Sequence, residues 1–187
     1  MKEKPSTLSS IIILLLAAFS SSACYASKGD DQANFFTEIY SNLCFTKITN
    51  LDSIRERISD APKLPPEKSA LFLADKPGDA WPVTSELGEF VLALPHNKNL
   101  CAVHARQLNT VTAEKLFRQI AESAPHPLIS LKLKDETRQT EANGEVRTIS
   151  YEWSLPGATR TLLFTLSIAP SADVQIQAIA SAAVVGQ

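Results

Sequence analysis

The sequence predicts an α+β domain in which N-terminal helices and one mid-chain helix pack on a mostly antiparallel sheet that ends in a four-strand meander. Three observations lead to this class. Helical periodicity dominates the N-terminal third of the chain. The stretch from Gly88 to Arg106 has two β-rich runs around a polar turn, which indicates a hairpin. From Leu128 onward the apolar period changes to two, and successive strands joined by short turns must pair antiparallel.

Residues 1–26 have the layout of a secretory signal peptide. Two lysines precede an apolar run, and small residues follow it up to Ala26. The run is too short to span a bilayer, which takes roughly 20 residues. Cleavage after Ala26 meets the small-residue rule and is the favoured prediction. Cleavage before Cys24 is the alternative, because Ser22-Ala23-Cys24 resembles a lipobox whose cysteine becomes lipidated.

Residues 27–187 are long enough for a single domain with its own core. Of the 18 basic and 20 acidic residues, Lys2, Lys4 and Glu3 lie in the leader, which leaves 16 and 19 and a net charge of −3. Nucleic acids and anionic membrane surfaces attract clustered Lys and Arg, and this chain has no such cluster. We therefore expect no nucleic-acid partner, and membrane association only through a lipidated Cys24.

Apolar spacing predicts the helices in order. The first runs from about Ala33 to Leu43 with Asp30 or Asp31 as its N-cap. A short helix follows from Asn50, and a third begins at Pro66, which suits a first turn, and ends near Leu73. Beyond the hairpin, a longer helix starts at Thr112, with Thr112 as cap and a hydrophobic staple between Val111 and Leu116.

The strand-rich half follows this helix. Ile129, Leu131 and Leu133 alternate with polar residues, which indicates a strand with one wet face. Asn143-Gly144 is a strong hairpin signal because a type I′ turn needs positive φ at both central positions. The later strands are predicted from alternating apolar positions: Ile149, Tyr151 and Trp153; Leu162, Phe164, Leu166 and Ile168; and Val174, Ile176, Ala178 and Ala180.

The mature chain keeps two cysteines, Cys44 and Cys101, an even count that predicts one disulfide in an oxidising compartment. Cys44 lies beside the apolar stripe of the first helix and Cys101 lies in the hairpin. Their bond would tie the N-terminal helices onto the sheet, and closing a loop of this length is worth at most roughly 4 kcal/mol.

Four short stretches carry a resemblance: Tyr40-Ser41-Asn42-Leu43-Cys44, Phe72-Leu73, Gly78-Asp79-Ala80-Trp81 and Leu100-Cys101-Ala102-Val103. Over roughly residues 35–120 the chain resembles a family of exported, often putatively lipidated proteins of Gram-negative bacteria with no assigned activity. The resemblance implies an envelope location and supports the pairing of Cys44 with Cys101. It implies no catalytic residue.

Few residues suggest chemistry. No His or Cys spacing is typical of a metal site, and no glycine-rich loop indicates a phosphate-bearing cofactor, so we expect neither. His104 is the best placed of the three mature histidines because a strand would hold it rigid, although such histidines are more often exposed or satisfied by a neighbour. Trp81 and Trp153 can line a ligand pocket, but more often such residues cover a sheet core.

Two pairs of carboxylates are candidates for acid–base chemistry. Glu86 with Glu89, and Asp135 with Glu136, lie close in sequence, but nothing in the sequence implies the burial that shifts a carboxyl pKa. The long polar hairpin around Asn143-Gly144 is a candidate partner contact, although many hairpin tips bind nothing.

These observations favour a non-enzymatic, exported envelope protein, periplasmic or anchored to the outer membrane on its periplasmic side, that recognises another envelope protein or an envelope ligand. Two alternatives stay open. One is a periplasmic hydrolase whose site forms only in three dimensions, and the other is a structural lipoprotein tethered through Cys24. An enzyme should show a deep pocket holding His104 or a buried carboxylate, and a binding module a flatter apolar patch.

Overall fold

The structure is a computed structural model that describes residues 27–141 and 143–186. Its helices are α1 (Lys28–Ile39), the π-helical turn η1 (Tyr40–Phe45), α2 (Asp52–Arg57), α3 (Pro66–Leu73) and α4 (Thr110–Glu122). Its strands are β1 (Gly78–Ser85), β2 (Gly88–Pro95), β3 (Leu100–Ala105), β4 (Ile129–Thr140), β5 (Gly144–Ser154), β6 (Arg160–Ile168) and β7 (Ala178–Gly186). The predicted α+β class is confirmed. The predicted signal peptide and Cys24 lie outside the described residues.

The strands of the described residues form one antiparallel sheet in the order β1-β2-β3-β7-β6-β5-β4. The four strands from β4 to β7 pair in succession, as predicted, and β1 to β3 form a second succession. The sheet as a whole is not a simple meander, because β3 pairs with β7 rather than with β4. The last strand therefore lies in the centre of the sheet.

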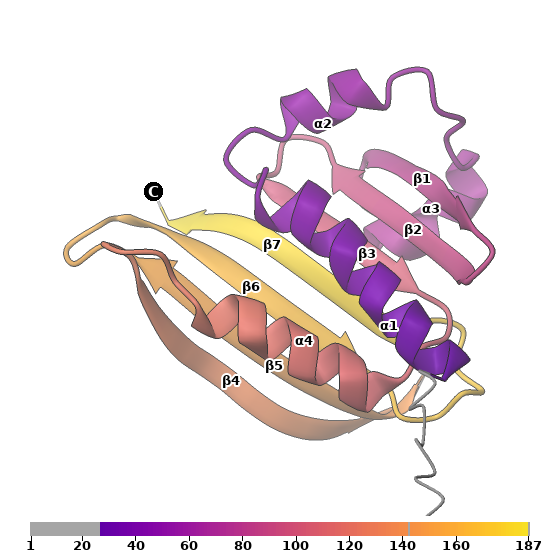
Figure 1. The fold of residues 1–187 in the computed structure, drawn as a ribbon. Helices are drawn as coiled ribbons and strands as arrows, with labels where there is room; N and C mark the ends of the chain where they lie inside the picture. The colour runs from indigo at the N-terminus through magenta and orange to yellow at the C-terminus, as the bar shows by residue number, and fades with distance from the viewer. Residues whose placement is uncertain (1–26, 142, 187) are drawn as a thin grey trace, which may run out of the picture.

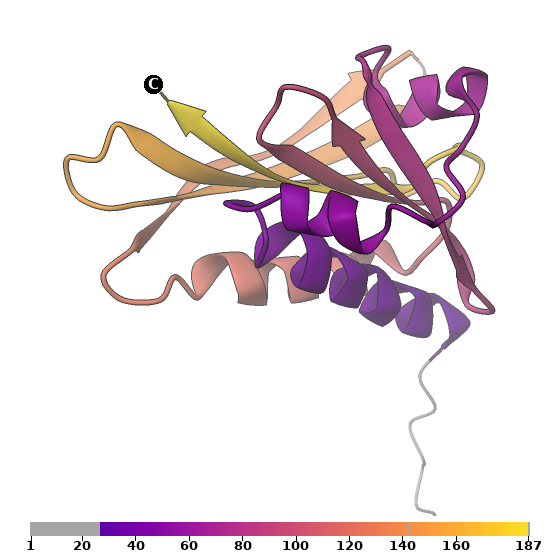
Figure 2. The same cartoon turned by 90° about the horizontal axis from the view of Figure 1, so that it is seen from above.

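Helices cover the two faces of the sheet unequally. α1 and α4 pack together on one face, which we call the front face, and α3 packs against β1 and β2 on the other, the back face. Figure 1 shows α1 and α4 in front of the sheet with α3 behind it, and Figure 2 shows the same layers from above. Across β4 to β6 the described residues place no helix on the back face.

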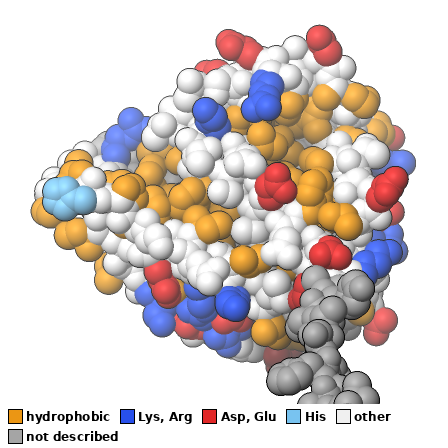
Figure 3. All heavy atoms as spheres, viewed as in Figure 1, with side chains coloured by type: hydrophobic (Ala, Val, Ile, Leu, Met, Phe, Trp, Pro, Cys, Tyr) orange, Lys and Arg blue, Asp and Glu red, His pale blue; other side chains and the backbone are white. Residues whose placement is uncertain are grey.

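The main core lies between the front face and the helices. α4 contributes the buried residues Ala113, Phe117 and Ala121, one per turn, as expected of an amphipathic helix. The predicted alternation in β5 and β6 is confirmed by the buried residues Ile149, Tyr151, Trp153, Phe164, Leu166 and Ile168. On the outer side of this layer, acidic and basic side chains are interspersed with apolar ones (Figure 3).

Cys44 and Cys101 join the N-terminal helices to the centre of the sheet. Their sulfur atoms lie at disulfide-bonding distance, with Cα atoms 5.2 Å apart and a sequence separation of 57 residues. Both side chains are fully buried, and the pair connects η1 to β3. The pairing agrees with the prediction, and a disulfide is typical of an oxidising compartment outside the cytoplasm.

The helix starts differ from the prediction. Ser27, not Asp30 or Asp31, caps α1, and Asp30 completes a capping box with it. Asn109 caps α4, and the Thr112 hydroxyl instead donates to Asp30 at 2.5 Å. The staple between Val111 and Leu116 is also wrong, since Val111 is 77 % exposed. These caps depend on contacts between α1 and α4, which are distant in sequence.

Two strand assignments also differ. No strand was predicted around Trp81, but these residues form β1, which pairs along its whole length with β2. Pro82 is tolerated there because β1 is an edge strand. The last strand begins at Ala178, and the predicted members Val174 and Ile176 lie in the preceding loop.

β4 presents its apolar residues to the side opposite the helices. Ile129, Leu131 and Leu133 are 50–55 % exposed, and the polar Ser130 faces the helices, where its hydroxyl donates to the Ala121 carbonyl. A β-bulge between Lys132 and Lys134 shifts the register at Leu133. One face of β4 is exposed to solvent, as predicted, but it is the face that carries the apolar residues, because α4 contacts the polar positions of this edge strand.

No helix among the described residues is long and apolar enough to cross a membrane.

Candidate functional site: a groove beside helix α3

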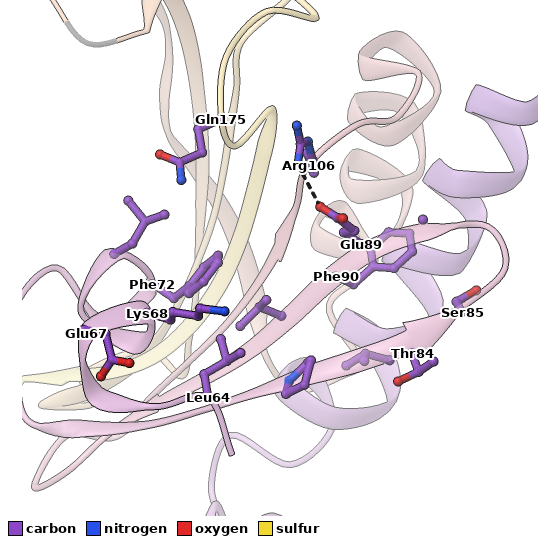
Figure 4. Close-up of a pocket in the computed structure, with 15 residues that line it drawn as sticks. Leu64, Glu67, Lys68, Phe72, Thr84, Ser85, Glu89, Phe90, Arg106 and Gln175 are labelled. Carbon is purple, nitrogen blue, oxygen red and sulfur yellow. Dashed lines mark hydrogen bonds and ion pairs between the residues drawn. The ribbon is translucent and has the colours of Figure 1, made fainter. Parts of the chain in front are cut away.

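A large cavity lies between α3 and the back face of the sheet, and we call it the α3 groove. Its volume is about 880 Å³. Figure 4 shows the side chains that line it. One wall comes from Leu64 and from Glu67, Lys68, Leu71 and Phe72 of α3; the other comes from residues 82–85 of β1, residues 88–91 of β2, Arg106 and Gln175.

The local sequence explains why α3 lies over β1 and β2. Pro66 occupies the first turn, where its fixed φ suits a helix and its missing N–H costs nothing. The helix ends at Ala74, which adopts a left-handed conformation with φ of 49°. Small residues beneath it, Ala80 and Ala93, allow Leu73 to be buried against the sheet. The groove begins where this close packing ends.

A smaller cavity of about 120 Å³ opens from the groove, and His104 of β3 forms part of its lining. The two spaces share Leu71, Phe72, Glu89, Val91, Arg106 and Gln175. The ring of His104 lies edge-on to that of Phe72, with centroids 5.2 Å apart. Across the sheet, His104 is flanked by Val91 of β2 and Ile179 of β7.

His104 is buried without hydrogen-bond partners. Its relative exposure is 5 %, and among the described residues neither ring nitrogen makes a hydrogen bond of good geometry. Burial lowers its pKa to about 4, while the Phe72 backbone close to the ring acts in the opposite direction. The ring is therefore neutral at physiological pH, with one N–H donor and one free acceptor nitrogen.

The charged residues of the groove lie nearer its rim. Arg106 and Glu89 form an ion pair of 3.1 Å, and both side chains are more than half exposed. Lys68 extends from α3 toward the strands (Figure 4), and no described carboxylate lies within ion-pair distance of its amine. The arrangement offers an apolar channel, a neutral hydrogen-bonding ring in the adjoining cavity and an available cation on the α3 wall of the groove.

No hydroxyl or thiol nucleophile lies beside His104 among the described residues. Those that line its cavity include no Ser, Thr or Cys. A neutral histidine with a pKa about 4 is also a weak general base at neutral pH. The site is therefore suited to binding through apolar contact and hydrogen bonds.

A comparison with protein-family models, with curated proteins and with solved structures finds no match. What this chain does must therefore be argued from its own residues.

The other predicted contact residues lie in the core. Trp81 is 4 % exposed, and the Lys63 amine lies 5.4 Å from its ring centroid. Trp153 is 6 % exposed and donates from its indole nitrogen to the Ala121 carbonyl at 2.6 Å. Neither indole lines the α3 groove.

The carboxylate pairs do not form acid–base sites. Asp135 faces the helices and bonds to Arg118 at 2.9 Å, which holds the pKa of Asp135 below its usual range, whereas Glu136 faces the opposite side of the sheet. Glu89 pairs with Arg106, and Glu86 lies in the turn between β1 and β2. Within the described residues, no group of three or more His, Cys, Asp or Glu side chains could hold a metal ion.

The sequence contained one signal for this site. His104 interrupts the run Leu100–Ala105, whose other members are apolar, and a polar residue inside a buried strand is informative. The groove itself had no local signal, because its walls come from α3, two strands and the loop at Gln175, which only the tertiary fold brings together.

Proposed function

We propose that this chain is an exported, non-enzymatic binding module of the cell envelope and that the α3 groove is its binding site. The observation that carries the proposal is the open apolar groove with a buried, unpartnered His104 beside it. An unsatisfied buried polar group costs free energy, and a ligand that bonds to it would recover that cost. The leader pattern, the paired cysteines and the resemblance to exported proteins support the location.

The hydrolase alternative has less support, because the lining of the His104 cavity supplies no nucleophile. The tethered-lipoprotein alternative concerns Cys24. Intact mass spectrometry of the mature protein from an envelope fraction separates these cases. A chain that starts at Ser27 and is two mass units below the reduced value supports a free, disulfide-bonded domain, and a diacyl adduct on Cys24 supports a tether.

Site-specific photocrosslinking in cells tests the binding site. A photoreactive amino acid at Leu71, which is 47 % exposed and lines the groove, should give a discrete adduct. The matched control is the same residue at Val111, an exposed apolar position on α4 at the other face. Equal adducts at both positions, or none at Leu71, would contradict the proposal.

A further inference from the structure

The cavity beside His104 is a side pocket of a longer channel. Leu71 and Gln175 line the α3 groove, the His104 cavity and a third recess of about 870 Å³ that reaches residues 143–145 and 170–176. The three spaces therefore adjoin one another around the end of α3. Small-molecule sites are clefts or cavities of roughly 300–1,000 Å³. The groove and the recess each approach that upper value, and together they form a channel longer than such a site, which suits an extended chain.

The side pocket has the size of one side chain. Its volume of about 120 Å³ is several times the roughly 30 Å³ that a water molecule occupies in the liquid. Phe72, Val91 and Ile176 make it largely apolar, and His104 supplies its buried hydrogen-bonding group. Neutral imidazole has one donor and one acceptor, which an amide or hydroxyl head complements without bringing a charge into the buried site.

The edge of the sheet excludes one other mode of peptide binding. The Leu64 amide donates to the Ala80 carbonyl at 2.8 Å, so the chain before α3 already occupies part of the outer edge of β1. Pro82, farther along, has no N–H to offer. A peptide bound here would therefore contact the side chains of the groove and would not pair with β1 as an eighth strand.

Lys68 favours a negatively charged group on the bound chain. It extends from α3 toward the strands in the groove (Figure 4), and no described carboxylate lies within ion-pair distance of its amine. The other cation at the rim, Arg106, is already paired with Glu89. A negative group on the bound chain close to its inserted side chain would be favoured here.

We infer that the α3 groove binds an extended segment of a partner polypeptide, with an amide or hydroxyl side chain inserted against His104 and an acidic residue facing Lys68. The inference rests on the proposed function and specifies its ligand.

Selection of peptides from a displayed library of random twelve-residue sequences tests the inference. On the wild-type protein, the selected peptides should share Asn, Gln, Ser or Thr at one position with Asp or Glu nearby. His104→Leu should weaken the best peptide about tenfold, the effect of one lost hydrogen bond. Lys68→Glu should weaken it similarly and reduce its salt dependence. Lys115→Glu, an exposed change on α4, and His96→Leu should have no effect.

The outcomes separate the inference from the proposed function. Peptides that crosslink at Leu71 but share no such motif, or bind His104→Leu equally well, would overturn the inference and leave the groove as a binding site. Absence of peptide binding together with absence of a Leu71 adduct in cells would overturn both. Because His104→Leu replaces an unpaired polar group by an apolar one, it should fold, and its melting curve verifies this.

Discussion

At the scale of single residues, His104 is a feature that fold stability does not explain. A histidine with both nitrogens unpartnered and 5 % exposure destabilises the free protein, because its polar atoms lose water and gain no bond. Such residues concentrate at functional sites, where a ligand restores what folding removed.

We expect His104→Leu to stabilise the free protein. Removing an unsatisfied buried polar group should raise the free energy of unfolding by about 1 to 3 kcal/mol. Thermal and urea melts at pH 7 measure this. His96→Leu is the control, because His96 is half exposed and a surface change should stay within about 0.5 kcal/mol. A clear loss of stability in His104→Leu would show that the ring is satisfied in solution.

The same histidine predicts how stability depends on pH. The pKa of His104 is about 4 in the folded state against an ordinary value of 6.5, so between these pH values the unfolded chain binds a proton that the folded chain does not. Unfolding free energy should therefore fall by about 3 kcal/mol as pH drops from 6.5 to 4. Glu67, Lys68, Glu89 and Arg106 are the charged groups that line the groove.

Urea titrations at pH 7, 5.5 and 4.5 measure this dependence. His104→Leu should remove most of it, while the acid transition below pH 4, to which carboxylates such as Asp135 contribute, should remain. Parallel curves for the two proteins would contradict the assignment.

At the scale of elements, the paired cysteines fasten η1 to β3. Cys44→Ser and Cys101→Ser should each lower the free energy of unfolding by the same amount, at most roughly 4 kcal/mol, because each opens the same loop of 57 residues. The double variant should lose no more than either single variant. Melting temperatures measure this, and additive losses would contradict the pairing.

A second inter-element contact joins α4 to β4 and β5. Arg118 bonds to Glu114 and Asp135, both at 2.9 Å, and to the Tyr151 hydroxyl at 3.1 Å. Arg118→Met should cost about 1 kcal/mol, since a partly buried network is worth more than an isolated surface pair. Arg118→Lys should not restore it, because an ammonium lacks the guanidinium fork.

Urea unfolding of these variants tests the contact, with Arg138→Met as the matched control. Arg138 is 70 % exposed and pairs with Glu136 on the other face of the sheet, so its removal should be nearly neutral. Equal losses at Arg118 and Arg138 would show that the network adds nothing.

At the scale of the whole molecule, the unequal covering of the sheet decides which leucines form the core. Leu166→Ala on the front face should cost about 2 to 5 kcal/mol, because it leaves a cavity in a fully buried site. Leu131→Ala on the back face should stay within about 0.5 kcal/mol, since that side chain is 55 % exposed. Chemical denaturation distinguishes them, and similar losses would place β4 in the core.

Local patterns in the sequence were enough to predict several strands, helix α3 and the cysteine pair. Alternation of period two identified β5 and β6 with their buried faces, because a side chain in a strand points to one face or the other. Pro66 and Leu73 bounded α3. Two cysteines left one intramolecular pairing, so the contact between η1 and β3 was predictable without coordinates.

The exposed face of β4 and the surroundings of His104 depend on residues that are distant in sequence, so they could not be predicted from local pattern. Apolar alternation in β4 was correctly read as a strand, but which face met water depended on α4, which contacts the polar positions and leaves Leu131 exposed. Likewise, His104 was singled out in the sequence because a strand would hold it rigid. The sequence did not show that its ring is buried without hydrogen-bond partners among the described residues. That burial depends on α3 and the loop at Gln175, which pack against His104 only in the folded protein.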